Sequence, residues 1–134
     1  MNGQSSYKLT HFICCERIES DDLNRQVLIA PFPIIELQCL PSAFSFGLSF
    51  GIYGINAAEK NVLSISMRAP DGSEILNANT EIPQSGNGSD CGMVFGLDTR
   101  NVMFNCEGEY AVNVSINGEA LEVPSIMVKN RKQK

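Results

Sequence analysis

The chain has 134 residues, 43% of them hydrophobic and only 19% charged, which predicts a folded domain with a real core rather than a disordered chain. Its net charge of −5 argues against a general nucleic-acid binder. Its five cysteines are an odd number with neither C-x-x-C nor zinc-ligand spacing, so they indicate neither a disulfide framework nor a metal site. There is no signal-peptide pattern and no long apolar run, so we expect no membrane association and a cytoplasmic protein with reduced thiols.

The first part of the chain is expected to form strands separated by short turns. Residues 8–18 carry apolar side chains on both faces, which is typical of a covered strand. Shorter strands are expected over 27–30 and 34–40, on either side of closely spaced prolines. Residues 19–25 are rich in acids, but they lack the EF-hand spacing of a calcium site, so we interpret them as a solvated turn.

Residues 44–53 form the longest strict alternation of the sequence, which predicts one long strand with a heavily buried apolar face. The opposite face carries only small side chains, contributed by Ser45, Gly47, Ser49 and Gly51. Such a smooth face could accept a partner or another backbone closely, or it could mark strong twist and bulges. The sequence leaves these two interpretations open.

Further strands are expected over 62–69, 73–76, 93–97 and 102–104. The turn at Pro70-Asp71-Gly72 connects the first two, because proline presets φ and glycine takes the left-handed position. Residues 77–92 are polar and rich in Asn, Ser and Gly, and we interpret them as a surface loop that is most flexible over 85–90. That segment lacks the lysine and the context of a phosphate loop.

The C-terminal part predicts a β-hairpin. Residues 110–116 alternate with period two, and Asn117-Gly118 suits a two-residue type I′ turn. The expected register places Ile116 opposite Glu119, Val114 opposite Leu121 and Val112 opposite Val123. The hydroxyl of Tyr110 could tie down a loop, as in immunoglobulin-like proteins, but the simpler interpretation is a core tyrosine whose hydroxyl lies at the rim.

These strands predict an all-β protein: a single-domain antiparallel β-sandwich of about seven to eight strands, immunoglobulin-like or C2-like, without a helix. A partly open barrel is the alternative. We divide the chain into a flexible N-terminus over 1–6, the β-sandwich domain over 7–128 and a basic tail over 129–134.

The sequence offers no recognisable catalytic set, and we expect no enzyme and no cofactor. His11 is the only histidine, it lies in an expected strand, and nothing selects one of the cysteines as its partner. We interpret it as structural. The acids are scattered, and there is no tryptophan to stack on a sugar. No metal-ligand or nucleophile motif occurs.

Several short motifs recur in the same order in a known family: Phe12-Ile13-Cys14-Cys15-Glu16, Ala69-Pro70-Asp71-Gly72, Gly108-Glu109-Tyr110 and Ile116-Asn117-Gly118-Glu119. From residues 9 to 128 the chain resembles a family of uncharacterised small β-sandwich proteins, a domain of unknown function, from bacteria and bacteriophages. The resemblance implies a β-sandwich and a phage or prophage setting, in which small proteins often bind host proteins, defence factors included. It supplies no catalytic residues.

We therefore expect a non-enzymatic, protein-binding β-sandwich, such as a phage or prophage accessory protein that binds a host protein in the cytoplasm. The alternative is a structural or self-assembling subunit, such as a virion accessory module, which would make the protein a homo-oligomer. A small hydrolase that uses His11 is the least supported hypothesis. The candidate partner surface consists of Ser45, Gly47, Ser49, Gly51, Ser85, Asn87 and Asp90.

Overall fold

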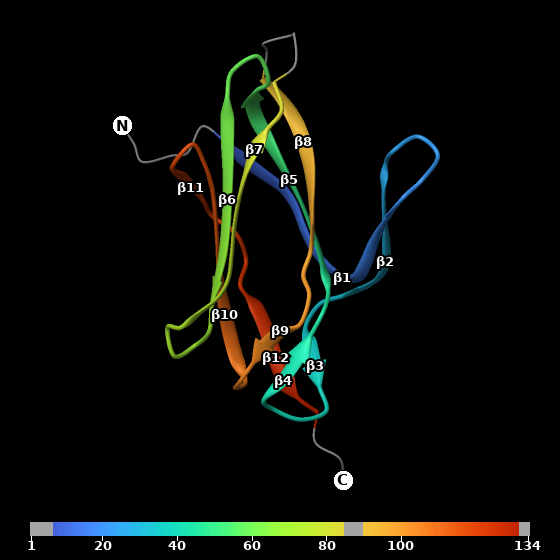
Figure 1. Ribbon diagram of the computed structural model, residues 1–134, viewed down its shortest axis with the longest axis vertical. Helices are drawn as coiled ribbons and strands as arrows, with labels where there is room; N and C mark the ends of the chain where they lie inside the picture. The colour runs from blue at the N-terminus through green and yellow to red at the C-terminus, as the bar shows by residue number, and fades with distance from the viewer. Residues whose placement is uncertain (1–6, 85–89, 132–134) are drawn as a thin grey trace.

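The computed structural model describes residues 7–84 and 90–131, with only the backbone of residues 90 and 91, and these residues form an all-β structure (Figure 1). No helix occurs in these ranges, and hence none that could cross a membrane. The strands are β1 (Lys8–Ser20), β2 (Gln26–Phe32), β3 (Ile35–Leu37), β4 (Ser42–Phe44), β5 (Gly47–Asn56), β6 (Asn61–Arg68), β7 (Glu74–Ile82), β8 (Asp90–Asp98), β9 (Val102–Phe104), β10 (Gly108–Ile116), β11 (Glu119–Leu121) and β12 (Ile126–Asn130).

These strands form two large sheets and one small one. The first sheet has the order β2-β1-β5-β8 and is antiparallel throughout. The second has the order β3-β12-β10-β6-β7, with β11 also paired to β10, and only its β3–β12 pair is parallel. Strands β4 and β9 form a separate two-stranded sheet.

The core combines residues from both large sheets. Leu48, Phe50 and Ile52 of β5 are buried, and they belong to the same cluster as Val114 and Ile116 of β10. The period-two pattern therefore identified the buried face of each strand correctly. Burial of this apolar surface is the main stabilising contribution that the sequence encodes.

The strands are more numerous than the seven or eight that the sequence predicts. The expected long strand over 44–53 is divided, since β4 ends at Phe44 and β5 begins at Gly47. The expected loop over 77–92 is wrong at both ends, because β7 continues to Ile82 and β8 already begins at Asp90. Among the described strands β7 pairs only with β6, so Asn77, Asn79 and Glu81, which suggested a loop, are exposed on an edge strand.

The C-terminal hairpin has the expected turn and most of the expected register. Asn117 and Gly118 both have positive φ, at 53° and 84°, as a type I′ turn requires. Val114 lies opposite Leu121, and Ile116 lies opposite Glu119. The predicted third pair is absent, because β11 ends at Leu121, and Val112 pairs instead with Met67 on β6.

Tyr110 fixes the loop that precedes its own strand. Its side chain is buried, and its hydroxyl donates to the carbonyl oxygen of Cys106 at 2.7 Å and accepts the Cys106 N–H at 3.4 Å. The interpretation of a hydroxyl at the rim is therefore wrong. Both hydrogen bonds close a loop four residues upstream, which is the role that such a tyrosine has in immunoglobulin-like folds.

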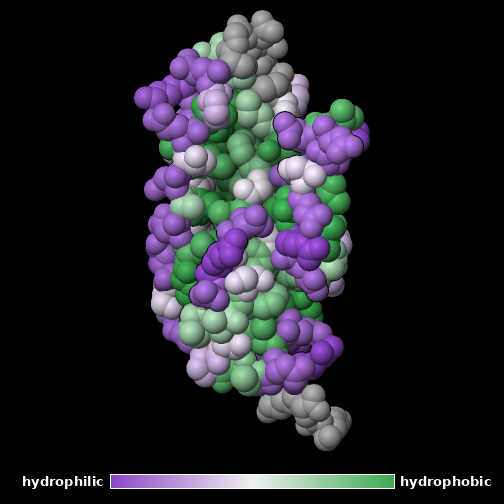
Figure 2. All heavy atoms as spheres, turned by 45° about the vertical axis from the view of Figure 1, so that its right-hand side comes forward, coloured by the Kyte–Doolittle hydropathy of each residue, from purple (hydrophilic) through white to green (hydrophobic). Residues whose placement is uncertain are grey.

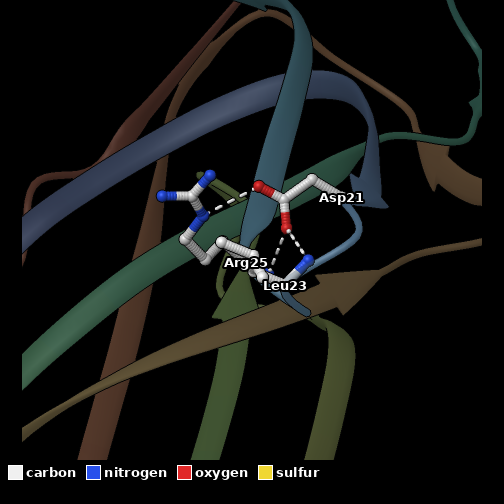
Figure 3. Close-up of polar contacts among 3 residues, drawn as sticks. All are labelled: Asp21, Leu23 and Arg25. Carbon is white, nitrogen blue, oxygen red and sulfur yellow. Dashed lines mark hydrogen bonds and ion pairs between the residues drawn. The ribbon is translucent and has the colours of Figure 1, made fainter.

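Residues 16–30 form an arm that leaves the first sheet. Strand β1 pairs with β5 only as far as Cys15, whereas its pairing with β2 runs from Cys14 to Ser20. The blue hairpin at the right of Figure 1 is this arm. At its tip the carboxylate of Asp21 accepts the backbone N–H groups of Leu23 and Arg25, and it also binds the Arg25 guanidinium at 2.8 Å (Figure 3).

Candidate functional site

The Ser/Gly face of β5 lies beneath other parts of the same chain. A Cβ atom added to Gly47 would lie 3.0 Å from Ile18 of the arm and 3.1 Å from the Cys15 sulfur. One added to Gly51 would overlap Thr10 and the His11 ring. Both glycines are therefore needed for the close approach of β1 and the arm. Since they are buried, neither is accessible to a partner in this structure.

Ser49, between the two glycines, is the centre of a small hydrogen-bonded group. Its hydroxyl donates to the amide oxygen of Gln26 at 2.6 Å, and it lies 2.9 Å from Nε2 of His11. The group joins β1, β5 and the first residue of β2. Because the Ser49 hydroxyl donates to Gln26, its oxygen can accept a hydrogen bond from His11 in the tautomer that carries the proton on Nε2. His11 in this tautomer does not act as a base toward Ser49, which is itself only 1% exposed.

Of the remaining residues of the predicted partner surface, the structure describes only Ser45 and the backbone of Asp90, and it does not bring these two together. Ser45 is exposed, and its hydroxyl accepts the backbone N–H of Asn101 at 2.8 Å. Asp90 begins β8 opposite Asn56. Ser85 and Asn87 lie outside the described residues. The structure therefore places Ser45 and Asp90 at opposite ends of the β5–β8 pair.

The two adjacent buried cysteines are not activated thiols, and the described residues hold no cluster suited to a metal ion. Burial raises the pKa of the Cys14 thiol to about 11, with a smaller contribution from Cys15. The pKa of Cys15 is also raised, mainly by burial. Both groups are therefore neutral thiols, which are poor nucleophiles and poor ligands. Over residues 7–84 and 90–131, no three His, Cys, Asp or Glu side chains are grouped as a metal ion would require.

The outer strands of the two large sheets differ in how their free edges are protected. Strand β3 is only three residues long, and β2 contains Pro31 and a left-handed Ala30. Strand β7 exposes acids and amides, namely Glu74, Asn77, Asn79 and Glu81. Short length, proline, irregular backbone and charge all discourage pairing with another strand.

Strand β8 has none of these protections along its centre. It is nine residues long, and within residues 7–84 and 90–131 it pairs only with β5. Its two charged residues are the first and the last, Asp90 and Asp98. Between them lie apolar residues and two glycines, without proline or lysine. Val94, at the middle, is 57% exposed. A long, uncharged edge of this kind is a template for another strand.

A pocket lies on each side of this edge. On the core side, a cavity of about 240 Å³ is lined by Phe95 and Leu97 of β8, Ala78 of β7, and the buried Phe50 and Ile65. On the outer side, a cavity of about 530 Å³ lies between β8 and the arm, and is lined by a set that includes Ile13, Leu28, Ser49 and Val94. Figure 2 shows hydrophobic atoms reaching the surface between two hydrophilic margins along much of the molecule. Successive side chains of a strand paired with β8 would point alternately toward these two pockets.

The sequence identified the centre of β8 as a strand but did not identify it as an edge. The sequence could have indicated a free edge only through an absence, since the run from Cys91 to Leu97 lacks the lysine or proline that usually protects an edge strand. That signal becomes informative only when the partner strands are known. The sequence directed attention instead to the face of β5, which the arm covers.

Comparison with known proteins identifies a family but no activity. No curated protein matches the chain. Among solved structures, the chain is similar to the crystal structure of a beta-glucosidase from Listeria innocua in complex with isofagomine, with 12% identity and a TM-score of 0.44. The likeness covers 95% of this chain but only 16% of that one. A family model matches residues 10–129, and the chain therefore belongs to the Family of unknown function (DUF6941).

Proposed function

We propose that this protein is a non-enzymatic binding module, a single-domain β-sandwich that recognises another protein by adding one of its strands to the free edge of β8. The observation that carries the proposal is the free edge of β8, which is uncharged between Asp90 and Asp98 and has a pocket on each side. From the resemblance to bacterial and phage proteins, we further propose a phage or prophage accessory protein whose partner is a host protein in the cytoplasm.

In strand addition, affinity and specificity come from different parts of the interface. Main-chain hydrogen bonds to the edge supply affinity for any extended segment, and pockets for alternate side chains supply specificity. The core-side pocket, at about 240 Å³, is smaller than the roughly 300–1,000 Å³ of typical small-molecule sites. This volume suits individual side chains of a bound strand, whereas the outer pocket, at about 530 Å³, lies within that range.

A pair of matched variants tests this proposal. Val94→Lys places a charge at the centre of the β8 edge, whereas Val62→Lys makes the same change at a residue of β6, an interior strand, that is 37% exposed. We expect a partner from a bacterial lysate to be captured by the unchanged protein and by Val62→Lys, and to be lost with Val94→Lys. Backbone amides of β8 should exchange more slowly in the complex. Equal capture by Val94→Lys, with unchanged exchange in β8, would refute strand addition at this edge.

A further inference from the structure

We infer that the segment recognised by β8 is an extended peptide with a basic residue at each end of an uncharged stretch, and not a second copy of this chain. This inference rests on the strand addition proposed above and specifies the chemistry of its partner. It follows from the register positions of the two acids of β8 and from the space around its two glycines.

A second copy is disfavoured by the charges of β8 itself. The antiparallel register that pairs the full length of two β8 strands is centred on Val94, and it places Asp90 of each copy opposite Asp98 of the other. Like charges directly opposite each other destabilise a strand pair, and this register contains the conflict at both ends. Each copy also carries a net charge of −5, which adds a general repulsion.

The same positions favour a basic partner. Asp98 is exposed at the end of β8, and Asp90 occupies the first register position of the strand, opposite Asn56 of β5. In an antiparallel partner, two lysines or arginines eight positions apart therefore take the register positions opposite Asp90 and Asp98. Opposite charges across a strand pair contribute favourably, and the contribution weakens with added salt.

The glycines of β8 specify the residues between the two charges. A Cβ atom added to Gly96 would lie 2.8 Å from Gln26 and 3.1 Å from Ile18, so the arm lies directly over Gly96. A small side chain at the partner position beside Gly96 leaves this contact of the arm undisturbed. Around Gly92, the nearest side-chain atom to such a Cβ belongs to Tyr53, at 3.8 Å. An aromatic side chain fits there, since aromatic residues pack well over glycines of a neighbouring strand.

A peptide of the same length as β8 combines these requirements. Its sequence is Lys-Val-Ser-Leu-Thr-Val-Tyr-Val-Lys with blocked ends, so that the serine faces Gly96, the tyrosine faces Gly92, and the apolar residues alternate toward the core-side pocket. Two control peptides replace both lysines with glutamine or with glutamate. Binding is measured by fluorescence anisotropy of labelled peptide at low and high salt, with hydrogen exchange to locate the site.

We expect the lysine peptide to bind at least roughly 16-fold more tightly than the glutamate peptide, with the glutamine peptide between them. Exchanging both lysines for glutamate removes two favourable pairs and creates two repulsive ones, and each of these four changes alters affinity by about two- to fivefold. The difference should shrink at high salt. At low salt, the variant Asp98→Lys should reduce the difference in affinity between the lysine peptide and the glutamate peptide. In each bound state the protected amides should belong to β8.

The possible results separate the two proposals. Equal affinity of the three peptides, with protection of β8, would refute the basic partner and leave strand addition intact. No binding of any peptide, or protection elsewhere, would overturn both proposals. Sedimentation that shows a concentration-dependent dimer, abolished by Val94→Lys but not by Val62→Lys, would make a second copy the occupant and refute the inference.

Discussion

The hydrogen-bonded group around Ser49 should hold the arm against the sheet, and Ser49→Ala tests this directly. The substitution removes one oxygen atom from a residue that is 1% exposed. It leaves the Gln26 amide without its donor at 2.6 Å and the His11 ring nitrogen without its partner at 2.9 Å. The apolar packing of β5 is unchanged, so the effect reports mainly on the polar group.

The expected magnitude follows from the two lost hydrogen bonds. Each contributes about 0.5–1.5 kcal/mol net, so Ser49→Ala should lower the free energy of unfolding by about 1–3 kcal/mol. The entropy of unfolding of a chain of 134 residues is roughly 0.28 kcal/mol/K. The same loss therefore corresponds to a decrease in Tm of about 4–11 °C.

Urea unfolding of four proteins measures this effect: the unchanged chain, Ser49→Ala, Gln26→Met and the double variant. Because Ser49 and Gln26 share one hydrogen bond, the double variant should be less destabilised than the sum of the single variants by at least about 0.5 kcal/mol. Ser64→Ala, at a half-buried serine of β6, is the control and should change stability by less than about 0.5 kcal/mol. A loss below this limit for Ser49→Ala, or strict additivity, would refute the role of the group in holding the arm.

Three further predictions concern thiols and the tyrosine. Burial raises the pKa of Cys14 from 9.0 to about 11, so the folded protein keeps its full stability below pH 9 and loses about 2–3 kcal/mol as pH rises toward 11. In Cys14→Val, the free energy of unfolding measured with urea should therefore fall less steeply between pH 9 and 11. An identical pH dependence in the variant and the unchanged protein would contradict this assignment. Iodoacetamide should modify the exposed Cys39 in the folded protein well before Cys14, as peptide mapping would show, and simultaneous modification would contradict the described burial. Tyr110→Phe should cost about 1–2 kcal/mol in urea unfolding and accelerate amide exchange at Cys106, whereas unchanged exchange would show that the hydroxyl does not fix this loop.

The sequence predicted local features well where one residue pattern has one physical meaning. Alternation identified the buried face of β5, and Asn117-Gly118 identified the turn and its register, because few sequences suit a type I′ turn. Prediction from the residue pattern failed where two kinds of structure have the same amino-acid composition. The polar residues of β7 suggested a loop, although an outward-facing edge strand has the same composition.

The location of the candidate site could not be predicted from the sequence, for a related reason. Ser45, Gly47, Ser49 and Gly51 indicated correctly that something approaches β5 closely, but a small-residue face is equally suited to a partner and to another segment of the same chain. Which of the two is present depends on the bend of β1 near Cys15, which turns the arm over that face. The free edge of β8 is in turn a property of strand order, which alternation does not encode.

The arm connects the Ser49 group to the proposed binding edge, because one wall of the outer pocket beside Val94 is formed by Gln26 and Leu28 of the arm. A bound strand that places side chains in this pocket contacts β8 and the arm together. Whatever holds the arm in place should then favour binding, and binding should hold the arm in place to the same extent. We therefore expect Ser49→Ala to weaken binding of the lysine peptide and the bound peptide to slow amide exchange in β2. Unchanged affinity in Ser49→Ala would show that the arm and the β8 edge act independently.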